Sequence, residues 1–494
     1  MKSKFFIVGF ALAAWNAVSA QGITFNKDIA PIVFQNCSGC HRPGEVGPMP
    51  LTNYAEVSAW GGMVKYVTAN KIMPPWRPDP HYSRFADERR LTDKEIELIG
   101  RWVDDDMPEG DPAHLPPFPD FPTGSPLGEP DVVYTIPAFT VPNNGDVYHR
   151  VTIPSGFTSD KWINGVELVP DNRAIVHHML LYVGQYMQNM IGGWVPGQRD
   201  RFLPNNMAYK VPAGSNLILE IHYAPGSMGQ VDQSQIKFHF SPNQINPRQV
   251  FIQPYINWIT GLQNGPLRLQ PGEVKTFNNS FNLSNNISVL GLSPHMHLIG
   301  RSMKVFSVHG SDTIRLIDVP DWNFAWQGFY TPQKLIKIPS GSAIKAISTY
   351  DNTSNNPFNP SSPPQLVNAG ESTYDEMLLC YFTFVNYQAG DENIWLTDTT
   401  QNALTVYPGD ADNDGNVTPS DFFLTAAGYG KAGPVRAPLH QSTVFRAQKA
   451  SYWPSATLYR GTSLNDAFLD ANGDGALNLF DVAVTVMHRG QSRP

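Results

Sequence analysis

The stretch Ser293-Pro294-His295-Met296-His297-Leu298-Ile299-Gly300 follows the apolar, β-favouring run Ile287-Ser288-Val289-Leu290-Gly291-Leu292. Because side chains alternate across a strand, His295 and His297 leave the backbone on the same side. Two imidazoles on one face make half of a copper or zinc site, although an isolated pair is more often a hydrogen-bonded surface feature. Metal binding is favoured here by further candidate ligands in strand-like sequence: His177, His178, His222 and Met377.

The composition favours a multidomain, mainly β protein. At about 150 residues per domain, 494 residues suggest three or four domains. Charged residues make up only 16% of the chain, aromatic residues reach 12%, and there are 43 prolines and 40 glycines. This mixture is typical of β-sandwiches with many tight turns. The net charge of -8, without a basic run, argues against nucleic acid as a partner.

Residues 1–20 have the pattern of an export signal peptide. Lys2 and Lys4 precede the apolar run Phe5–Ala14, and Val18-Ser19-Ala20 forms a small-residue cleavage site. We therefore expect a periplasmic, secreted or cell-surface protein. No later segment is long enough to cross a bilayer, so we do not expect it to span a membrane.

Cys37-Ser38-Gly39-Cys40-His41 is the attachment signature of a c-type haem. The thiols of Cys37 and Cys40 would add to the haem vinyl groups, and His41 would bind the iron. A dithiol redox pair has no need of the histidine. A zinc site would need two more ligands of the same kind, which are missing, so haem c is favoured.

The opposite iron ligand is expected to be Met73, in the proline-fixed loop Lys71–Trp76. Met49, Met63 and Met107 are its rivals. Downstream, Leu91–Val103 predicts an amphipathic helix with Thr92 and Glu95 in a capping box. Residues 21–115 together resemble a small α-helical cytochrome c domain, and the proline-rich residues 116–127 predict a semi-rigid linker.

Short strand-like runs broken by Pro, Gly and Asn predict antiparallel β-domains at 128–245 and 246–400. The pair His177 and His178 raises a geometric problem, because adjacent residues of a regular strand point in opposite directions. Binding of both to one ion would need a local twist or the use of different ring nitrogens. His222 supplies a plausible third nitrogen from another strand.

Four short motifs in one order resemble the copper type II, ascorbate-dependent monooxygenases, the family of the peptidylglycine α-hydroxylating and dopamine β-monooxygenases. The matching segments are Val176-His177-His178-Met179, Ile221-His222-Tyr223, His295-Met296-His297 and Asp375-Glu376-Met377. The resemblance implies two antiparallel jelly-roll domains with one copper each. His177, His178 and His222 would hold an electron-transfer copper, and His295, His297 and Met377 a copper that binds O₂.

The ligand chemistry agrees with this assignment, because a soft thioether favours Cu(I). Met296 and Met303 could compete with Met377 for that role. Tyr381 matches a family tyrosine and is a further candidate catalytic residue. The segment Asp321–Trp326 could line the cleft, although an aromatic core is the more ordinary interpretation.

Two departures from the family concern disulfides and substrate. Outside the haem motif the chain retains only Cys380, which we interpret as a small buried apolar residue. Peptide-hydroxylating members hold a substrate carboxylate with an arginine where Ser293 stands, and Leu379 replaces a substrate-contacting asparagine. A small, more apolar substrate is therefore expected.

Two segments near the C-terminus, Asp410–Asp421 and Asp470–Asp481, fit the EF-hand calcium loop. Position 12 is Asp in both, as in dockerin modules, which residues 405–494 resemble, although Ala437–Thr462 separates the copies further than in a compact dockerin. Docking to a cohesin-like or surface partner and simple stabilisation are both open. The expected calcium ligands are Asp410, Asp412, Asp414, Asn416, Asp421, Asp470, Asn472, Asp474 and Asp481.

Together these features predict an exported copper-dependent monooxygenase that hydroxylates a C–H bond of a small molecule with O₂. Two coppers, one haem c and two calcium ions are expected, and the fused haem would supply electrons in place of, or relaying from, ascorbate. The alternative is a non-catalytic copper-binding or electron-transfer protein. A calcium-stabilised adhesin would have no use for the haem motif.

Overall fold

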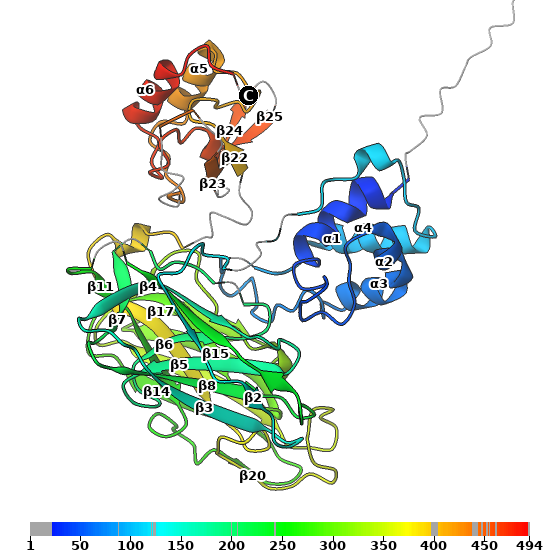
Figure 1. Cartoon of the computed structure of the whole chain (residues 1–494), viewed down its shortest axis with the longest axis vertical. Helices are drawn as coiled ribbons and strands as arrows, with labels where there is room; N and C mark the ends of the chain where they lie inside the picture. Colours follow the sequence, from blue (N-terminus) through cyan, green and yellow to red (C-terminus); the bar gives the residue numbers. More distant parts are fainter. Residues whose placement is uncertain are drawn as a thin grey trace, which may run out of the picture. The chain divides into compact units, whose positions relative to one another are not determined.

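The computed structural model describes residues 22–492 apart from 87, 120, 122–124, 199, 205, 242–243, 397–403, 437–442, 446–447, 451–452, 454 and 460–461. The predicted signal peptide lies outside these residues. The chain divides into two compact units, Met1–Pro74 with Arg90–Asp120 and Pro75–Arg89 with Phe121–Pro494. The helices of the first unit are drawn in blue and cyan in Figure 1. Among the described residues, no helix combines the length and apolar character needed to span a bilayer.

The first unit is helical. Its last long helix, α4 (Asp93–Asp104), starts where the sequence predicts, with the Thr92–Glu95 capping box formed and Trp102 buried. Asn53 caps another helix by accepting a hydrogen bond from the Glu56 backbone N–H. The remaining elements are η1 (Phe25–Ile29), α1 (Ala30–Asn36), α2 (Tyr54–Ala59), α3 (Gly61–Ala69) and η2 (Pro112–His114).

Pro75–Arg89 belongs to the β-rich unit, although the sequence analysis assigned it to the domain at 21–115. Phe85 is 2% exposed and joins the second β hydrophobic cluster, with its ring centroid 5.6 Å from Tyr330 and 6.2 Å from Trp76. Nothing in the local sequence of this proline-rich loop signals the partner. The segment belongs to the β-rich unit because Phe85 is buried against Tyr330, which is distant in the sequence.

The first β series, at 128–245, forms two sheets whose inner residues share one hydrophobic cluster. One sheet has the order β1 (Val132–Thr135), β10 (Gln235–Phe240), β4 (Lys161–Val169), β7 (Met207–Val211) and β11 (Arg248–Gln249). The other has the order β3 (Val147–Pro154), β8 (Asn216–Tyr223), β5 (Val176–Val183) and β6 (Met190–Trp194). A small ribbon pairs β2 (Phe139–Thr140) with β9 (Val231–Asp232).

The second β series repeats this plan. One sheet has the order β12 (Phe251–Asn257), β21 (Leu379–Asn386), β15 (Ile287–His295) and β18 (Ile336–Ile338). The other has the order β14 (Val274–Asn282), β19 (Ala343–Asp351), β16 (Gly300–His309) and β17 (Asp312–Val319). Short elements complete the series: β13 (Arg268–Leu269), β20 (Val367–Asn368), η3 (Phe324–Trp326) and η4 (Asp391–Asn393).

The divide between the two series lies slightly later than residue 245. Arg248–Gln249 still pairs with β7 of the first series, and β12 of the second begins at Phe251. Along β19, every second side chain is buried, because one face of the sheet packs on the core and the other meets solvent. The expected mainly β fold with antiparallel sheets is confirmed.

The C-terminal segment contains two helices, α5 (Pro419–Ala427) and α6 (Leu479–Met487), each preceded by one of the acidic loops. The hydroxyls of Thr425 and Thr485 lie 3.4 Å apart between these helices. The other elements are β22 (Leu404–Val406), β23 (Gln448–Ala450), β24 (Ala456–Tyr459), β25 (Thr462–Asn465) and η6 (Asp466–Phe468).

Candidate metal centres and their shared pocket

The first histidine cluster is created by an irregularity in β5. The antiparallel register of β5 with β8 shifts between Val176 and His178, and His178 then lies directly opposite His222. A bulge of this kind re-aims one side chain of a strand. It lets His177 turn to the side already occupied by His178, which resolves the geometric problem posed by the adjacent pair.

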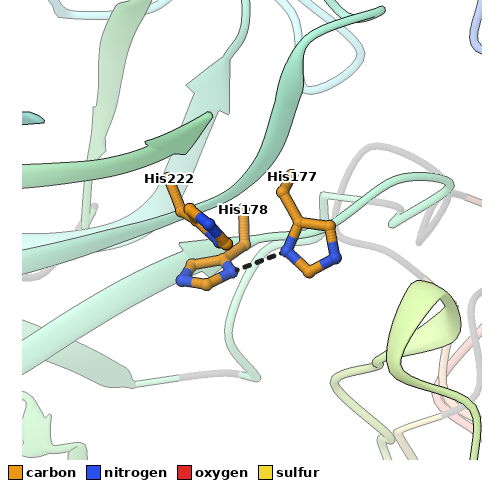
Figure 2. A group of neighbouring side chains, drawn as sticks. All are labelled: His177, His178 and His222. Atoms are coloured by element: carbon orange, nitrogen blue, oxygen red, sulfur yellow. Dashed lines mark hydrogen bonds between the residues drawn. The ribbon is translucent and has the colours of Figure 1, made fainter. Parts of the chain in front are cut away.

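The three rings converge on one point (Figure 2). Their ring centroids lie 4.9–5.4 Å apart, and one nitrogen of each lies within 4.8 Å of the others. The Nδ1 atoms of His177 and His178 are 3.2 Å apart. Three imidazole nitrogens at these separations match the donor set of a copper or zinc site.

Outer contacts leave the inward nitrogens of the cluster available. His222 uses Nε2 to contact Asp146 Oδ1 at 2.9 Å, while its buried Nδ1 has no hydrogen-bond partner. Burial opposes ionisation of Asp146, but the contact with His222 helps to outweigh it, and the pKa of this carboxyl lies below its usual value. A carboxylate behind a ligating histidine is a common way to orient the ring and raise its basicity.

Two rings of the cluster, those of His177 and His178, are neutral at neutral pH. Burial, reinforced by the neighbouring His222, lowers the pKa of His177 to about 3. The same causes lower the pKa of His178 well below its usual value. Since a metal binds the neutral imidazole, these rings need not lose a proton before binding a metal ion at neutral pH.

The second cluster lies at the end of β15. His295 Nδ1 donates to Gln327 Oε1 at 2.6 Å, and His297 Nδ1 donates to the Asp375 carbonyl at 3.0 Å. These contacts select the tautomer in which Nε2 carries the free lone pair on both rings. The ring centroids are 5.1 Å apart, and burial lowers the pKa of His295 to about 3 and that of His297 to about 4.

A buried carboxyl group joins this turn to the segment that carries the candidate thioether. Glu376 accepts hydrogen bonds from the backbone N–H groups of His297 and Ile299, both at 2.9 Å, and from that of Met377 at 3.2 Å. Burial raises the pKa of Glu376 to about 8. The Met377 carbonyl also accepts from Tyr350 Oη at 2.8 Å. Met377 is thereby held next to the His295–Ile299 turn.

His178 of the first cluster and both rings of the second border one pocket of about 80 Å³ with a mostly apolar and aromatic lining. The lining includes His178, His295, His297, Met377, Phe324 and Tyr381. Burial raises the pKa of Tyr381 to about 12, so its hydroxyl remains protonated. The pocket therefore brings His178, from the first β series, next to the three ligand candidates of the second.

The rival thioethers are placed elsewhere. Met296 and Met303 are fully buried in the second β hydrophobic cluster, and Met296 packs beside Trp322 at Gly300. The segment Asp321–Trp326 was expected either to line the cleft or to be aromatic core. Trp322 belongs to the core, and Phe324 lines the pocket. Sequence reasoning missed Asp146 and Gln327, since no local pattern shows which distant ring each one faces. Cys380 is fully buried, as expected.

The haem motif follows α1. Cys37 ends that helix by donating its backbone N–H to the Val33 carbonyl at 2.8 Å, and burial raises the pKa of its thiol to about 12. His41 Nδ1 contacts the Met49 carbonyl at 3.0 Å, which leaves Nε2 available for a metal. This arrangement fits an iron-ligating histidine.

Two rivals of Met73 have other surroundings. The Met107 sulfur lies against Gly61 and belongs to the helical core, and Met63 is half exposed on α3. Met73 itself lies in the loop after α3 and is partly exposed. The choice of the second iron ligand stays a prediction.

The acidic loops differ. Ligand oxygens of Asp410, Asp412 and Asp414 lie within 4.8 Å of one another, which fits a calcium site in the first loop. The second loop has Asn472 where the first has Asp412. Among its described residues, no three acidic side chains have oxygens this close together. The buried Arg436 instead donates to the Asp470 carbonyl. Asp421 and Asp481 complete the capping boxes of α5 and α6, whose N-cap residues are Thr418 and Asn478.

No family model matches the sequence. Among solved structures, peptide-N(4)-(N-acetyl-β-D-glucosaminyl) asparagine amidase is similar with a TM-score of 0.26 and 10% identity, over 52% of this chain and 97% of that chain. A Paenibacillus xanthan lyase has a TM-score of 0.15 and 11% identity, over 56% and 28% of the respective chains. Similarities this weak support no inference about fold or function.

Proposed function

We propose that this chain is an exported copper-dependent monooxygenase that hydroxylates a C–H bond of a small, rather apolar molecule. The observation that supports the proposal most is the shared pocket, where one ring of a three-histidine set meets a second set made of His295, His297 and the buried thioether of Met377. One set offers nitrogen alone, and the other adds sulfur. This difference suits two coppers with different preferred oxidation states.

Each group of residues has a role in this proposal. His177, His178 and His222 hold one copper, while His295, His297 and Met377 hold the second. When bound, copper supplies one-electron chemistry and activation of O₂. The apolar lining excludes water and receives the substrate. Tyr381 borders the same space with a protonated hydroxyl that can orient bound groups.

The electron balance gives the haem motif a purpose. Insertion of one oxygen atom of O₂ into a C–H bond, with reduction of the other atom to water, consumes two external electrons and two protons. Cys37, Cys40 and His41 would attach a haem c that receives electrons one at a time from ascorbate or another reductant. The fold would combine cytochrome c, jelly-roll and dockerin-like parts.

The decisive variant is Met377→Leu, which keeps the size and apolar character of the side chain while removing the sulfur. We expect the purified chain to retain haem and the three-histidine copper but to lose substrate-dependent O₂ uptake and the hydroxylated product. Metal analysis and product detection by mass spectrometry are the measurements. Turnover within about tenfold of the unmodified chain would refute the assignment.

A second candidate function is a copper-binding electron-transfer protein without a substrate. The small volume of the pocket, about 80 Å³, favours it, since little room remains for an organic molecule. Screening small apolar molecules for stimulated O₂ consumption separates the two. Copper and haem loading without stimulation by any member of the panel would support the electron carrier.

For residues 405–494 we propose calcium binding, carried by the Asp410–Asp412–Asp414 cluster. Bound calcium would neutralise the acidic loop and stabilise this segment, with docking to a partner as a further role. Calcium titration by isothermal calorimetry tests it, and an Asp412→Asn variant should bind more weakly. A titration without heat at either loop would refute the assignment.

A further inference from the structure

The segment Phe324–Gln327 contacts both histidine clusters, although none of its residues is a candidate ligand. The Phe324 ring is stacked on His177, with centroids 4.7 Å apart and an interplanar angle of 24°. The same ring meets His297 edge-on, at 5.6 Å and 78°. A single aromatic side chain thus separates a ring of the first cluster from a ring of the second.

The same segment also makes polar contacts that reach the second cluster. The Phe324 carbonyl accepts a hydrogen bond from Gln327 Nε2 at 3.1 Å. The Gln327 amide then accepts from His295 Nδ1 through Oε1, at 2.6 Å. The Gln327 side chain therefore links the Phe324 backbone to the His295 ring of the second cluster.

The segment is itself anchored at its start. Asn323 caps η3 by accepting from the Ala325 backbone N–H at 2.9 Å, and the neighbouring Trp322 donates Nε1–H to the His297 carbonyl at 3.1 Å. Trp322 is buried in the second β hydrophobic cluster. A movement of this segment would thus disturb contacts to both clusters at once.

We propose that Phe324 and Gln327 are positioning residues that couple the two histidine sites, holding them as one closed redox pair around a common pocket. The inference rests on the proposed function. In it, an electron passes between two adjacent centres that border one pocket, one oxidised as the other is reduced. The segment belongs to the second β series, so this coupling also fixes how that series faces His177 of the first.

The test loads the full chain with two equivalents of Cu(II) and records electron paramagnetic resonance spectra, which need no substrate turnover. In the unmodified chain we expect dipolar broadening from two nearby Cu(II) ions. Phe324→Leu and Gln327→Leu should reduce this broadening while copper analysis still finds both ions at saturating metal. Phe358→Leu, at an exposed aromatic residue of the same unit, is the matched control.

Copper affinity provides a second readout that simple packing would not produce. Gln327→Leu should weaken copper at the His295–His297 site by about 10- to 100-fold and also alter the spectrum of the three-histidine site. Gln327→Glu retains an acceptor for His295 Nδ1 but loses the donor to the Phe324 carbonyl. It should therefore restore copper affinity at the His295–His297 site and leave the spectrum of the three-histidine site altered. In Gln327→Leu, changes confined to one site would overturn the inference, as would an unmodified chain without dipolar broadening.

These outcomes are separable from the fate of the proposed function. Dipolar coupling in a chain that forms no hydroxylated product would refute the monooxygenase proposal and support the coupling of the two sites. Hydroxylation by a chain with two magnetically isolated coppers would support the monooxygenase and refute the coupling. Phe324→Leu could also change the spectra by destabilising the fold, which a lower unfolding temperature would reveal. In that case the comparison of Gln327→Glu with Gln327→Leu still tests the inference, because the two side chains are similar in size and occupy the same position.

Discussion

The two histidine sites differ in how their rings are held. In the first, a strand irregularity aims His177 and His178 at the same point, and a carboxylate, Asp146, contacts the third ring. In the second, His295 and His297 leave the end of β15 on one side, and their outer nitrogens meet a neutral amide and a backbone carbonyl. Each site contributes imidazole rings to the lining of one pocket, His178 from the first site and His295 and His297 from the second.

This difference shows how similar ligands can be tuned apart. A carboxylate partner makes an imidazole a stronger donor and favours the higher charge of Cu(II), whereas neutral acceptors and a thioether favour Cu(I). We infer that the protein separates the two redox roles through groups behind the ligands as well as through Met377. The following variants, from the largest expected effect to the smallest, test this contrast.

Glu376→Ala should have the largest effect. It removes the acceptor of three backbone N–H groups, those of His297, Ile299 and Met377. Each buried donor left unsatisfied costs about 1–3 kcal/mol, so we expect a loss of about 5 kcal/mol in the free energy of unfolding. Urea unfolding measures it, and copper should be lost selectively from the second site.

The control for this variant is Glu371→Ala. The Glu371 side chain is more than half exposed, and its contact with Arg150 is 3.3 Å long. An exposed ion pair contributes about 0–1 kcal/mol, so stability should change little. Equal losses for the two variants would contradict a special role for the buried carboxyl group.

Asp391→Asn should weaken an attachment between the two β series, each of which carries one of the sites. Arg248, from the strand paired with β7, donates to both oxygens of Asp391 at 2.7 Å, and Ser288 of β15 donates at 2.6 Å. Removing one charge of a buried pair costs about 3–5 kcal/mol. Chemical unfolding at neutral pH is the measurement, and an unchanged midpoint would contradict the prediction.

The same ion pair predicts a pH dependence. Burial opposes ionisation of Asp391, but hydrogen bonds from Arg248 and Ser288 outweigh it and hold its pKa below the ordinary 3.8. Its stabilising contribution is therefore complete above the ordinary carboxyl pKa and is lost as the pH falls through the lowered value. Acid unfolding of the Asp391→Asn variant should lack this component.

Asp146→Asn should have a smaller effect, confined to one site. It keeps an acceptor for His222 Nε2 but removes the charge. We expect about tenfold weaker copper binding at the three-histidine site and a shift of its reduction potential toward Cu(I). Copper titration followed by electron paramagnetic resonance separates the sites. An equal loss at the His295–His297 site would contradict the division of roles.

Ser293→Ala should have the smallest effect. Ser293 Oγ donates to the Gly328 carbonyl at 3.0 Å, at the edge of the pocket. Loss of one such bond costs about 1 kcal/mol. The unfolding temperature should fall slightly while copper binding at both sites stays unchanged. A marked change in substrate preference would show that Ser293 contacts the substrate directly.

The sequence by itself determined the parts whose signals are local. The capping box at Thr92 and Glu95, the two acidic loops and the alternation that puts His295 and His297 on one side all follow from residues a few positions apart. The mainly β character follows from composition and turn spacing. Such signals are readable because backbone geometry fixes the relation between near neighbours.

Only the tertiary structure decided which distant groups meet. The shift in β5 that joins His177 to His178, the contact of Asp146 with His222 and the bridging position of Phe324 depend on strand register and sheet packing. The packing of Phe85 in the second β hydrophobic cluster also depends on residues that are distant in the sequence. Register and packing are set by the burial of many side chains together, so no local pattern carries them.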